Sequence, residues 1–553
     1  MDAKEKTMVA LQFGTSGLRD TVENMTDMEC YINTRGFISY LASIKEFKEG
    51  DYIAIAGDRR PSTYRIKMAV GKAIIDTGGR VDDQGLVPSP AVALYAISKG
   101  MPSIMVTGSH IPADRNGIKF TKRSGEVLKS DEKGILASVQ SERKKIYALK
   151  QKEFIFNEKG MFDETNRKEL VGLLADPDKV AESSGVYRKR YIDFLGTQFL
   201  KGAKVFLYQH SAVGRDIVKD IFTALGAEIV APQEEPYRSK EFVPVDTESV
   251  STQTLEIFKK CMKSSGTDIG ITLDGDSDRP LLVYRDGKEY KYVTGDILGL
   301  LTIISLEKLG AKINSVSVPI SSNDAIATVL EEKGTKVSFT KIGSPYVVAS
   351  MNESLQRNKG KGDWNVFSWE SNGGFLLGSD LTIDGKVLNA LPTRDAVLPL
   401  VSVIKMTLML SKSMREIISD LPSRYTYADR KKDFPQESSK AILEYLTPSS
   451  MLNAERRSGK EEIVEGDKGF EEIKNKVGKV FTSARGFSGV LKVNYIDGIR
   501  IYFNNGDISH LRPSGNAPEF RNYGIAGTPE RSKEIVDIGL NEIIPLMEKI
   551  CRQ

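Results

Sequence analysis

Cysteine is scarce in this chain, and its scarcity excludes one class of architecture. Only Cys30, Cys261 and Cys551 occur among 553 residues. Their odd number and wide spacing argue against a disulfide framework or a zinc cluster built on cysteine. A reducing, cytoplasmic compartment therefore fits the sequence best.

Long apolar runs and a strong excess of one charge are also missing. The longest apolar run, residues 297–306, is too short to cross a bilayer, and the charged first residues do not resemble a signal peptide. Lysine and arginine total 78 against 74 for aspartate and glutamate, so the net charge is only +4. We therefore expect neither a membrane nor a nucleic-acid partner.

The length and the order of the predicted elements indicate several α/β domains. At about 150 residues per domain, the chain predicts three or four of them. A pattern that starts with a strand, continues through helices and ends with a strand occurs three times. The predicted elements are residues 52–56, 64–77, 91–98 and 103–106 in the first copy, 204–208, 215–225, 255–264 and 269–273 in the second, and 315–318, 324–333, 337–339, 346–355 and 365–367 in the third. Each copy predicts a parallel or mixed sheet flanked by helices.

The rest of the chain does not follow this pattern. Residues 141–184 are charged and helix-prone, with no obvious site residues. After residue 425, strands at 490–495, 499–503 and 509–511 and a closing helix at 532–550 predict a smaller domain of a different type. The expected division is domain I at 1–150, a linker or helical insertion at 151–185, domain II at 186–308, domain III at 309–424 and domain IV at 425–553.

Polar residues follow the last strand of each α/β copy. Ser109 and His110 come after the first, residues 274–279 after the second and residues 369–374 after the third. Because α/β sheets bind ligands at the carboxyl ends of their strands, we expect these three loops to line one cleft.

Ser109 follows a short apolar strand and a glycine. Gly108 lets the backbone turn where the strand ends, which would leave the Ser109 hydroxyl projecting from a rim beside His110. A serine held in this way can carry a phosphoryl group. The alternative is that Ser109 only caps the following turn, and its own loop does not decide between the two.

Three aspartates alternate in the second loop. Alternate side chains of an extended loop share one face, so Asp274, Asp276 and Asp278 can converge on a hard divalent cation. An EF-hand is excluded because arginines, Arg279 and Arg285, stand at its sixth and twelfth positions. Three protein ligands leave room for a phosphate oxygen, which suits Mg²⁺ in phosphoryl transfer. A solvated acidic turn is the alternative.

Two further loops offer groups for phosphate and sugar. Residues 512–518 combine a fork of arginine donors with hydroxyl, amide and backbone N–H groups, which predicts a phosphate cradle; a plain hairpin turn is the alternative. Short polar side chains in the loop after residue 369 can hydrogen-bond to sugar hydroxyls, although a plain loop is equally consistent with them. The residues concerned are Arg512, Ser514, Gly515, Asn516 and Arg521 for phosphate, and Glu370, Ser371 and Asn372 for sugar.

In this order, the motifs resemble those of the α-D-phosphohexomutase family. The resemblance rests on residues 14–19 (Gly14-Thr15-Ser16-Gly17-Leu18-Arg19), 107–110, 274–279, the Glu370 loop and 512–515, and it spans nearly the whole chain. It implies three similar mixed-sheet α/β domains and a smaller C-terminal α+β domain of the TATA-box-binding-protein-like fold, arranged around a central cleft.

The resemblance also implies a reaction. Hexose 1-phosphate and 6-phosphate would interconvert through a phosphoserine at Ser109 and a hexose 1,6-bisphosphate that serves as intermediate and activator. Mg²⁺ would lie between that phosphate and the three aspartates. Lys119, His110 and Arg279 would neutralise the transferred group.

The same resemblance implies further roles. Arg19 and Lys119 are candidates for general acid or base. Lys341 corresponds to a basic position of the third domain that contacts substrate. The Arg512 loop would hold the phosphate that does not react.

The sugar is the least determined part of the prediction. Bacterial relatives usually have Gly-Glu-x-Ser-Gly-His in the sugar loop, whereas residues 369–374 contain no histidine; Asn516 and Pro280 are smaller departures. We favour phosphomannomutase, with phosphoglucomutase and phosphoglucosamine mutase as alternatives. A non-catalytic sugar-phosphate-binding protein is disfavoured because Ser109 and all three aspartates are present. The expected partners are small sugar phosphates, and the expected state is a monomer or homodimer.

Overall fold

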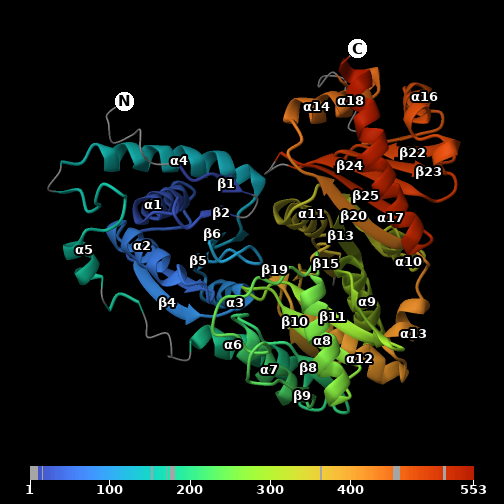
Figure 1. Cartoon of the computed structure of the whole chain (residues 1–553). Helices are drawn as coiled ribbons and strands as arrows, with labels where there is room; N and C mark the ends of the chain where they lie inside the picture. The colour runs from blue at the N-terminus through green and yellow to red at the C-terminus, as the bar shows by residue number, and fades with distance from the viewer. Residues whose placement is uncertain are drawn as a thin grey trace. The chain divides into compact units, whose positions relative to one another are not determined.

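The computed structural model describes residues 10–14, 17–150, 153–170, 172–174, 181–361, 364–452, 461–514 and 518–552 (Figure 1). The chain separates into two compact units. Unit 1 contains Met1–Ser317 and Gly343–Ile417, and unit 2 contains Val318–Ile342 and Ile418–Gln553. In the described ranges, every helix is too short or too polar to cross a membrane.

The first sheet of unit 1 is mixed and carries four helices. Its order is β1-β2-β6-β5-β3-β4, with β7 beside β6. The strands are β1 (Phe13–Gly14), β2 (Gly17–Thr21), β3 (Tyr52–Gly57), β4 (Arg80–Leu86), β5 (Ser103–Val106), β6 (Arg115–Lys122) and β7 (Gly125–Glu126), and the helices are α1 (Asp27–Ser43), α2 (Thr63–Asp76), α3 (Ser89–Lys99) and α4 (Lys129–Tyr147). Gly57 of β3 pairs with Val106 of the parallel strand β5, so the residues after these two strands emerge side by side.

Helix α4 includes the first part of the charged, helix-prone stretch. Residues 141–147 form its last two turns, which pack against α1. The Arg143 guanidinium pairs with the buried Glu29 carboxylate, and Arg35 Nε donates to Glu142 Oε2 over 2.8 Å. Ion pairs with buried carboxylates therefore hold this segment against α1. Residues 151–152, 171 and 175–180 of the predicted linker lie outside the described ranges.

The second and third sheets are also mixed. The second has the order β12-β11-β10-β8-β9, and in unit 1 the third runs β13-β15-β16-β19. The strands of the second sheet are β8 (Lys204–Leu207), β9 (Glu228–Val230), β10 (Ile269–Leu273), β11 (Pro280–Asp286) and β12 (Glu289–Val293), and those of the third are β13 (Ser315–Pro319), β15 (Val366–Trp369), β16 (Phe375–Leu377) and β19 (Leu391–Asp395). The helices of this part of the chain are α6 (Glu182–Leu195), α7 (Arg215–Ala224), α8 (Thr252–Ser265), α9 (Gly295–Lys308), α11 (Ser344–Arg357) and α12 (Val397–Leu410). Strands β5, β10 and β15 are short apolar runs with almost fully buried side chains, typical of central strands.

Unit 2 contains an antiparallel sheet in the order β20-β25-β24-β23-β22-β21. Helix α17 packs across β20 and β25 (Figure 1). The elements are β20 (Tyr425–Lys431), β21 (Glu462–Val464), β22 (Val490–Asn494), β23 (Ile499–Phe503), β24 (Ile508–Pro513), β25 (Phe520–Ala526), α14 (Gln436–Tyr445), α16 (Phe470–Val480), α17 (Pro529–Ile538) and α18 (Ile544–Arg552). The predicted fold class, three mixed α/β sheets and a smaller α+β part at the C-terminal end, is confirmed.

A buried carboxylate ties α6 to the third sheet. Asp395, at the end of β19, accepts hydrogen bonds from the hydroxyls of Tyr187 and Tyr191, the latter at 2.5 Å. Its Oδ2 also accepts from the backbone N–H of Leu398 over 3.1 Å, so the same carboxylate caps α12. The Asp395 carboxylate, its bond to the start of α12 and the two tyrosine hydroxyls together fix the end of β19.

Replacing Tyr191 by phenylalanine is expected to destabilise unit 1. The ring stays, but the buried Asp395 carboxylate loses one of its donors, which costs about 1–3 kcal/mol. Urea denaturation followed by fluorescence measures the effect. The control is Tyr64→Phe, since Tyr64 is 52 % exposed. Equal stability of the two variants would contradict this account.

Candidate active site

Ser109 lies directly beyond β5, where its backbone is held in an uncommon conformation. Its φ is +58°, in the left-handed region; this conformation costs about 1–3 kcal/mol and persists only where the surrounding structure enforces it. Its side chain is fully buried, and its Oγ donates to Asp274 Oδ2 over 2.5 Å. The hydroxyl therefore faces the aspartate loop and does not project from a rim. The left-handed residue is Ser109 itself, whereas the sequence assigned the turn to Gly108.

The three aspartates converge as the alternation predicted. One ligand oxygen from each of Asp274, Asp276 and Asp278 lies within 4.8 Å of the others, and all three residues are buried. Burial, followed by the charges of Asp276 and Asp278, raises the pKa of Asp274 well above its ordinary value. Such an arrangement favours a bound cation, because removing three close carboxylates from water is costly.

Two basic side chains donate hydrogen bonds to this cluster, and Arg279 forms longer ion pairs with it. Lys119, on β6, donates to Asp276 and, over 2.8 Å, to Asp278 Oδ2. Arg394, on β19, donates from Nε to the same Asp278 oxygen over 3.0 Å and from Nη1 to Glu370 Oε1 over 2.9 Å. Burial alone would raise the pKa of Asp278, but Arg394 and Lys119 hold it below its ordinary value.

The donor set still has capacity for a divalent cation. Asp276 Oδ1 and Asp278 Oδ1 are buried and accept no hydrogen bond from the residues that the structure describes, although Arg279 Nε lies 3.7 Å from Asp278 Oδ1. A buried carboxylate oxygen normally has a partner, and here both belong to a cluster of oxygen ligands that also includes Asp274. The residues therefore fit a hard cation such as Mg²⁺.

His110 and Arg19 complete the basic surroundings. His110 Nδ1 is 2.8 Å from Arg279 Nη1, and since a guanidinium only donates, Nδ1 accepts. Burial and the charge of Arg279 lower the pKa of His110 to about 2, so the imidazole is neutral. Burial and the same charge lower the pKa of Arg19 to about 10.

The predicted sugar loop lies in the same unit. Glu370 is 7 % exposed and shares Arg394 with the aspartate loop. The backbone carbonyl of Asn372 accepts from Thr247 Oγ1 over 3.0 Å, and its side-chain oxygen accepts from the Gly374 N–H. The Asn372 amide oxygen thus holds the loop itself, whereas the sequence assigned it to the sugar.

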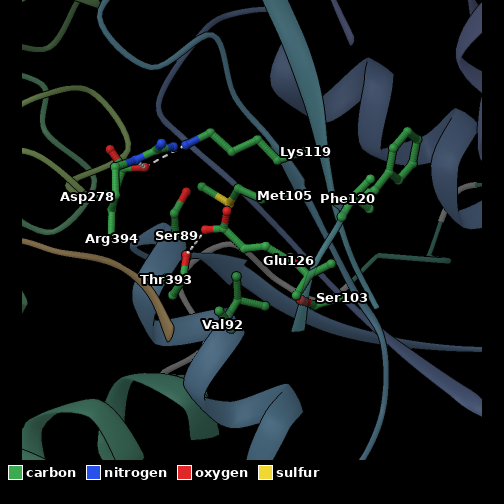
Figure 2. A pocket seen from close by; sticks show the side chains of 13 residues that line it. Ser89, Val92, Ser103, Met105, Lys119, Phe120, Glu126, Asp278, Thr393 and Arg394 are labelled. Atoms are coloured by element: carbon green, nitrogen blue, oxygen red, sulfur yellow. Dashed lines mark hydrogen bonds and ion pairs between the residues drawn. The ribbon is translucent and has the colours of Figure 1, made fainter. Parts of the chain in front are cut away.

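Arg394 and Ser89 are residues of this site that the sequence reasoning missed. Figure 2 shows both with Lys119 and Asp278 around a cavity of about 30 Å³. Ser89 Oγ donates to Asp276 Oδ2 over 2.5 Å. Arg394 stands at the end of β19, so the rule that selected polar residues at strand ends could have found it; Ser89, at the start of α3, carries no comparable signal.

The remaining predicted residues belong to unit 2. Asp497 links two of the segments concerned, because its Oδ2 accepts from the Ile342 N–H over 2.9 Å and is 3.0 Å from Arg512 Nε. Arg512 faces Arg521 across the strands β24 and β25. Lys341 directly precedes Ile342, whose N–H contacts the same Asp497 carboxylate as Arg512. Ser514 is the last described residue of the Arg512 loop before the gap. Gly515 and Asn516 lie outside the described residues.

Three family models match the chain in sequence order. They are described as phosphoglucomutase/phosphomannomutase α/β/α domains I, II and III, and they match residues 10–146, 189–287 and 294–425. The three matches correspond to the three mixed sheets.

Individual relatives cover nearly the whole chain. A phosphomannomutase of Salmonella muenchen is 35 % identical over 537 residues, which is 96 % of this chain and 95 % of the relative. A phosphomannomutase of Sinorhizobium fredii is 33 % identical and covers 96 % and 98 %. Among solved structures, a phosphoglucomutase/phosphomannomutase family protein of Burkholderia thailandensis has the same fold, with a TM-score of 0.68, 16 % identity and coverage of 99 % and 98 %. The chain belongs to the phosphoglucomutase/phosphomannomutase family.

Proposed function

We propose that this protein is a phosphohexomutase that interconverts hexose 1-phosphate and hexose 6-phosphate, with mannose phosphates as its preferred substrates. The observation that carries the proposal is the 2.5 Å hydrogen bond from Ser109 Oγ to Asp274 inside a buried group of carboxylates and fixed cations. A serine that only caps a turn does not require three buried aspartates beside its hydroxyl. The preference for mannose is supported by the names of the two relatives at 33–35 % identity.

Asp274, Asp276, Asp278 and an oxygen on Ser109 are the groups that would hold Mg²⁺. This assignment is supported by the Oδ1 atoms of Asp276 and Asp278, which accept no hydrogen bond from the described residues. When bound, the ion would offset the negative charge of the phosphoryl group and of the aspartates.

The reaction begins with a phosphoryl group on Ser109 Oγ. The P–O bond to Ser109 breaks and a P–O bond to the free sugar hydroxyl forms, which gives the hexose 1,6-bisphosphate. The proton of the sugar hydroxyl passes to a neighbouring base and ends on Ser109 Oγ; Lys119 and Arg19 are the candidates. The other phosphate then returns to Ser109 by the reverse steps, so atoms and charge balance over one cycle.

The neighbouring residues orient these groups and exclude water. Arg279 donates to His110, and the neutral imidazole stands beside Ser109, with 3.4 Å between Nδ1 and Oγ. Glu370 and Ser371 would select the sugar. In unit 2, Lys341 and the loop with Arg512, Ser514, Gly515, Asn516 and Arg521 would bind the phosphate that does not react, since arginine forks match phosphate oxygens.

Two measurements test the proposal together. Intact-mass analysis of the purified protein and of Ser109→Ala detects a phosphoryl group on Ser109. Assays with the 1-phosphates of mannose, glucose and glucosamine, each with Mg²⁺ and a catalytic amount of the matching 1,6-bisphosphate, measure turnover. The expected result is turnover that is fastest with mannose. Faster turnover of glucose or glucosamine would correct only the sugar, whereas no turnover of any of the three would favour a sugar-phosphate-binding protein without catalysis.

A further inference from the structure

Arg60, just beyond β3, lies behind the Ser109 loop and has a completely buried side chain. Its guanidinium nitrogens donate to one carboxylate and to four backbone carbonyls of the loop. The bonds are Nε to Asp58 Oδ2 at 3.1 Å, Nη1 to the carbonyls of Pro112 at 2.6 Å and Arg115 at 3.0 Å, and Nη2 to those of Ser109 at 2.9 Å and Ile111 at 2.6 Å. One planar group thus fixes the course of the backbone from residue 109 to residue 115.

Asp58 carries the same restraint to the Ser109 amide. Its carboxylate accepts from Thr107 Oγ1 over 2.7 Å and from Thr63 Oγ1 over 2.9 Å. Thr107 Oγ1 in turn accepts from the Ser109 N–H over 2.7 Å. Both the N–H and the carbonyl of Ser109 are therefore tied to the Asp58–Arg60 pair. This explains how a serine keeps its left-handed φ.

Close packing connects Arg60 with the aspartate loop. The ring of Phe242 lies under the guanidinium, with 4.0 Å from Cζ to the ring centroid, which is a cation–π contact. A Cβ on Gly275 would lie 2.5 Å from the Ser109 carbonyl oxygen and 2.9 Å from Phe242. A Cβ on Gly108 would lie 2.7 Å from Arg60 Cζ, so glycine is required there to admit the guanidinium. The serine loop, Arg60, Phe242 and the aspartate loop thus form one packed stack.

We propose that Arg60 is a positioning residue, which acts through the backbone of residues 109–115 and sets Ser109 Oγ against Asp274. Phe242, which packs between Arg60 and Gly275, fixes the position of the aspartate loop relative to the serine loop. The inference rests on the proposed function in one respect: its kinetic effect presupposes phosphoryl transfer at Ser109.

The test compares two arginines of the same sheet region. Arg65 has similar chemistry, because it donates to the Asp27 carboxylate over 2.7 Å and to the carbonyls of Val22 and Met25, but it does not touch the serine loop. Lysine keeps the charge and loses the planar fork. Arg60→Lys is expected to lower kcat by about 10- to 100-fold, because a small misplacement of a reacting group is enough for such a loss. Arg65→Lys is expected to change kcat by less than about twofold at the same folded fraction.

KM separates positioning from a role in substrate binding. Arg60→Lys should leave KM for the hexose phosphate within about threefold of wild type, because Arg60 does not face the substrate. A raised KM with unchanged kcat would overturn the proposal, as would equal kcat values for Arg60→Lys and Arg65→Lys.

Hydrogen–deuterium exchange gives a readout that does not depend on activity. Peptides covering residues 107–115 should exchange faster in Arg60→Lys than in wild type or Arg65→Lys. Unchanged exchange would overturn the proposal even if turnover fell. If wild type shows no turnover but exchange responds as expected, the proposed function fails while the structural role of Arg60 holds.

Phe242 provides an independent arm. Phe242→Leu should lower kcat by about three- to tenfold, since it removes the cation–π contact and loosens the stack. Phe258→Leu is the control, because Phe258 is fully buried in the core of the second sheet and packs against Phe206 and Tyr208. Equal kcat values for these two variants would show that Phe242 does not position the aspartate loop relative to the serine loop.

Discussion

Ser109→Ala is expected to lose turnover by on the order of 10⁴-fold or more, the scale seen when an enzyme loses its covalent residue. Alanine has no oxygen to accept or return the phosphoryl group. The substitution removes one buried hydrogen bond to Asp274, which costs about 1–3 kcal/mol, and a chain of this size should stay folded after such a loss. Loss of turnover would therefore report on chemistry and not on stability.

Coupled assays of 1-to-6 phosphate conversion measure this effect, and intact mass shows whether the variant still carries phosphate. Ser305→Ala is the matched control, because the Ser305 hydroxyl is also buried and donates to a carbonyl, that of Ser402, over 2.6 Å. The control should keep full activity. If Ser109→Ala retained more than about a tenth of wild-type turnover, another group would have to be the phosphoryl carrier.

Much of this site follows from short patterns in the sequence. Residues 103–106 and 269–273 match β5 and β10 in every residue, because a mainly apolar run of four or five residues bounded by polar loops suits a buried strand and is too short for a typical helix. Polar residues beyond such strands gather at the carboxyl edge of each sheet. Ser109 follows a strand of the first sheet and Asp274 follows a strand of the second, so their contact also depends on how the two sheets pack, which the strand patterns alone do not predict.

The contributions of Arg60 and Arg394 could not be predicted in the same way. A long side chain reaches several possible partners, and only the packed fold decides among them. The Arg60 guanidinium donates to four carbonyls of a loop about fifty residues later in the chain. Arg394 donates to Asp278 and to Glu370, which belong to two loops far apart in sequence. The pairing of Arg143 with Glu29 is a similar case: a charged residue is normally exposed, and only the packed fold shows that a buried partner exists.

Asp276→Asn is expected to lower turnover by about 10²- to 10³-fold and to raise the Mg²⁺ concentration needed for half-maximal activity. Asp276 is fully buried, accepts from Ser89 and Lys119 through Oδ2, and has an unpartnered Oδ1. Asparagine keeps the shape but removes one negative charge and turns one oxygen ligand into an N–H₂ group. The N–H₂ group cannot bind a cation. If it takes the place of Oδ2, it faces two other donors, Ser89 and Lys119, instead of accepting from them.

The second readout is binding of Mg²⁺ to the unphosphorylated protein by calorimetry, which does not depend on catalysis. Asp131→Asn is the matched control: Asp131 is also buried and accepts from a lysine, Lys122, at 2.8 Å and from a hydroxyl, that of Tyr40, at 2.6 Å, but it caps α4 away from the aspartate loop. The control should lose some stability and keep the wild-type response to Mg²⁺. If Asp276→Asn bound Mg²⁺ as tightly as Asp131→Asn, Asp276 would not be a ligand, and its unpartnered oxygen would need another explanation. Weaker binding in Asp276→Asn alone would separate a ligand from an ordinary buried carboxylate, because both aspartates accept from a lysine and a hydroxyl, but only Asp276 has two neighbouring carboxylates.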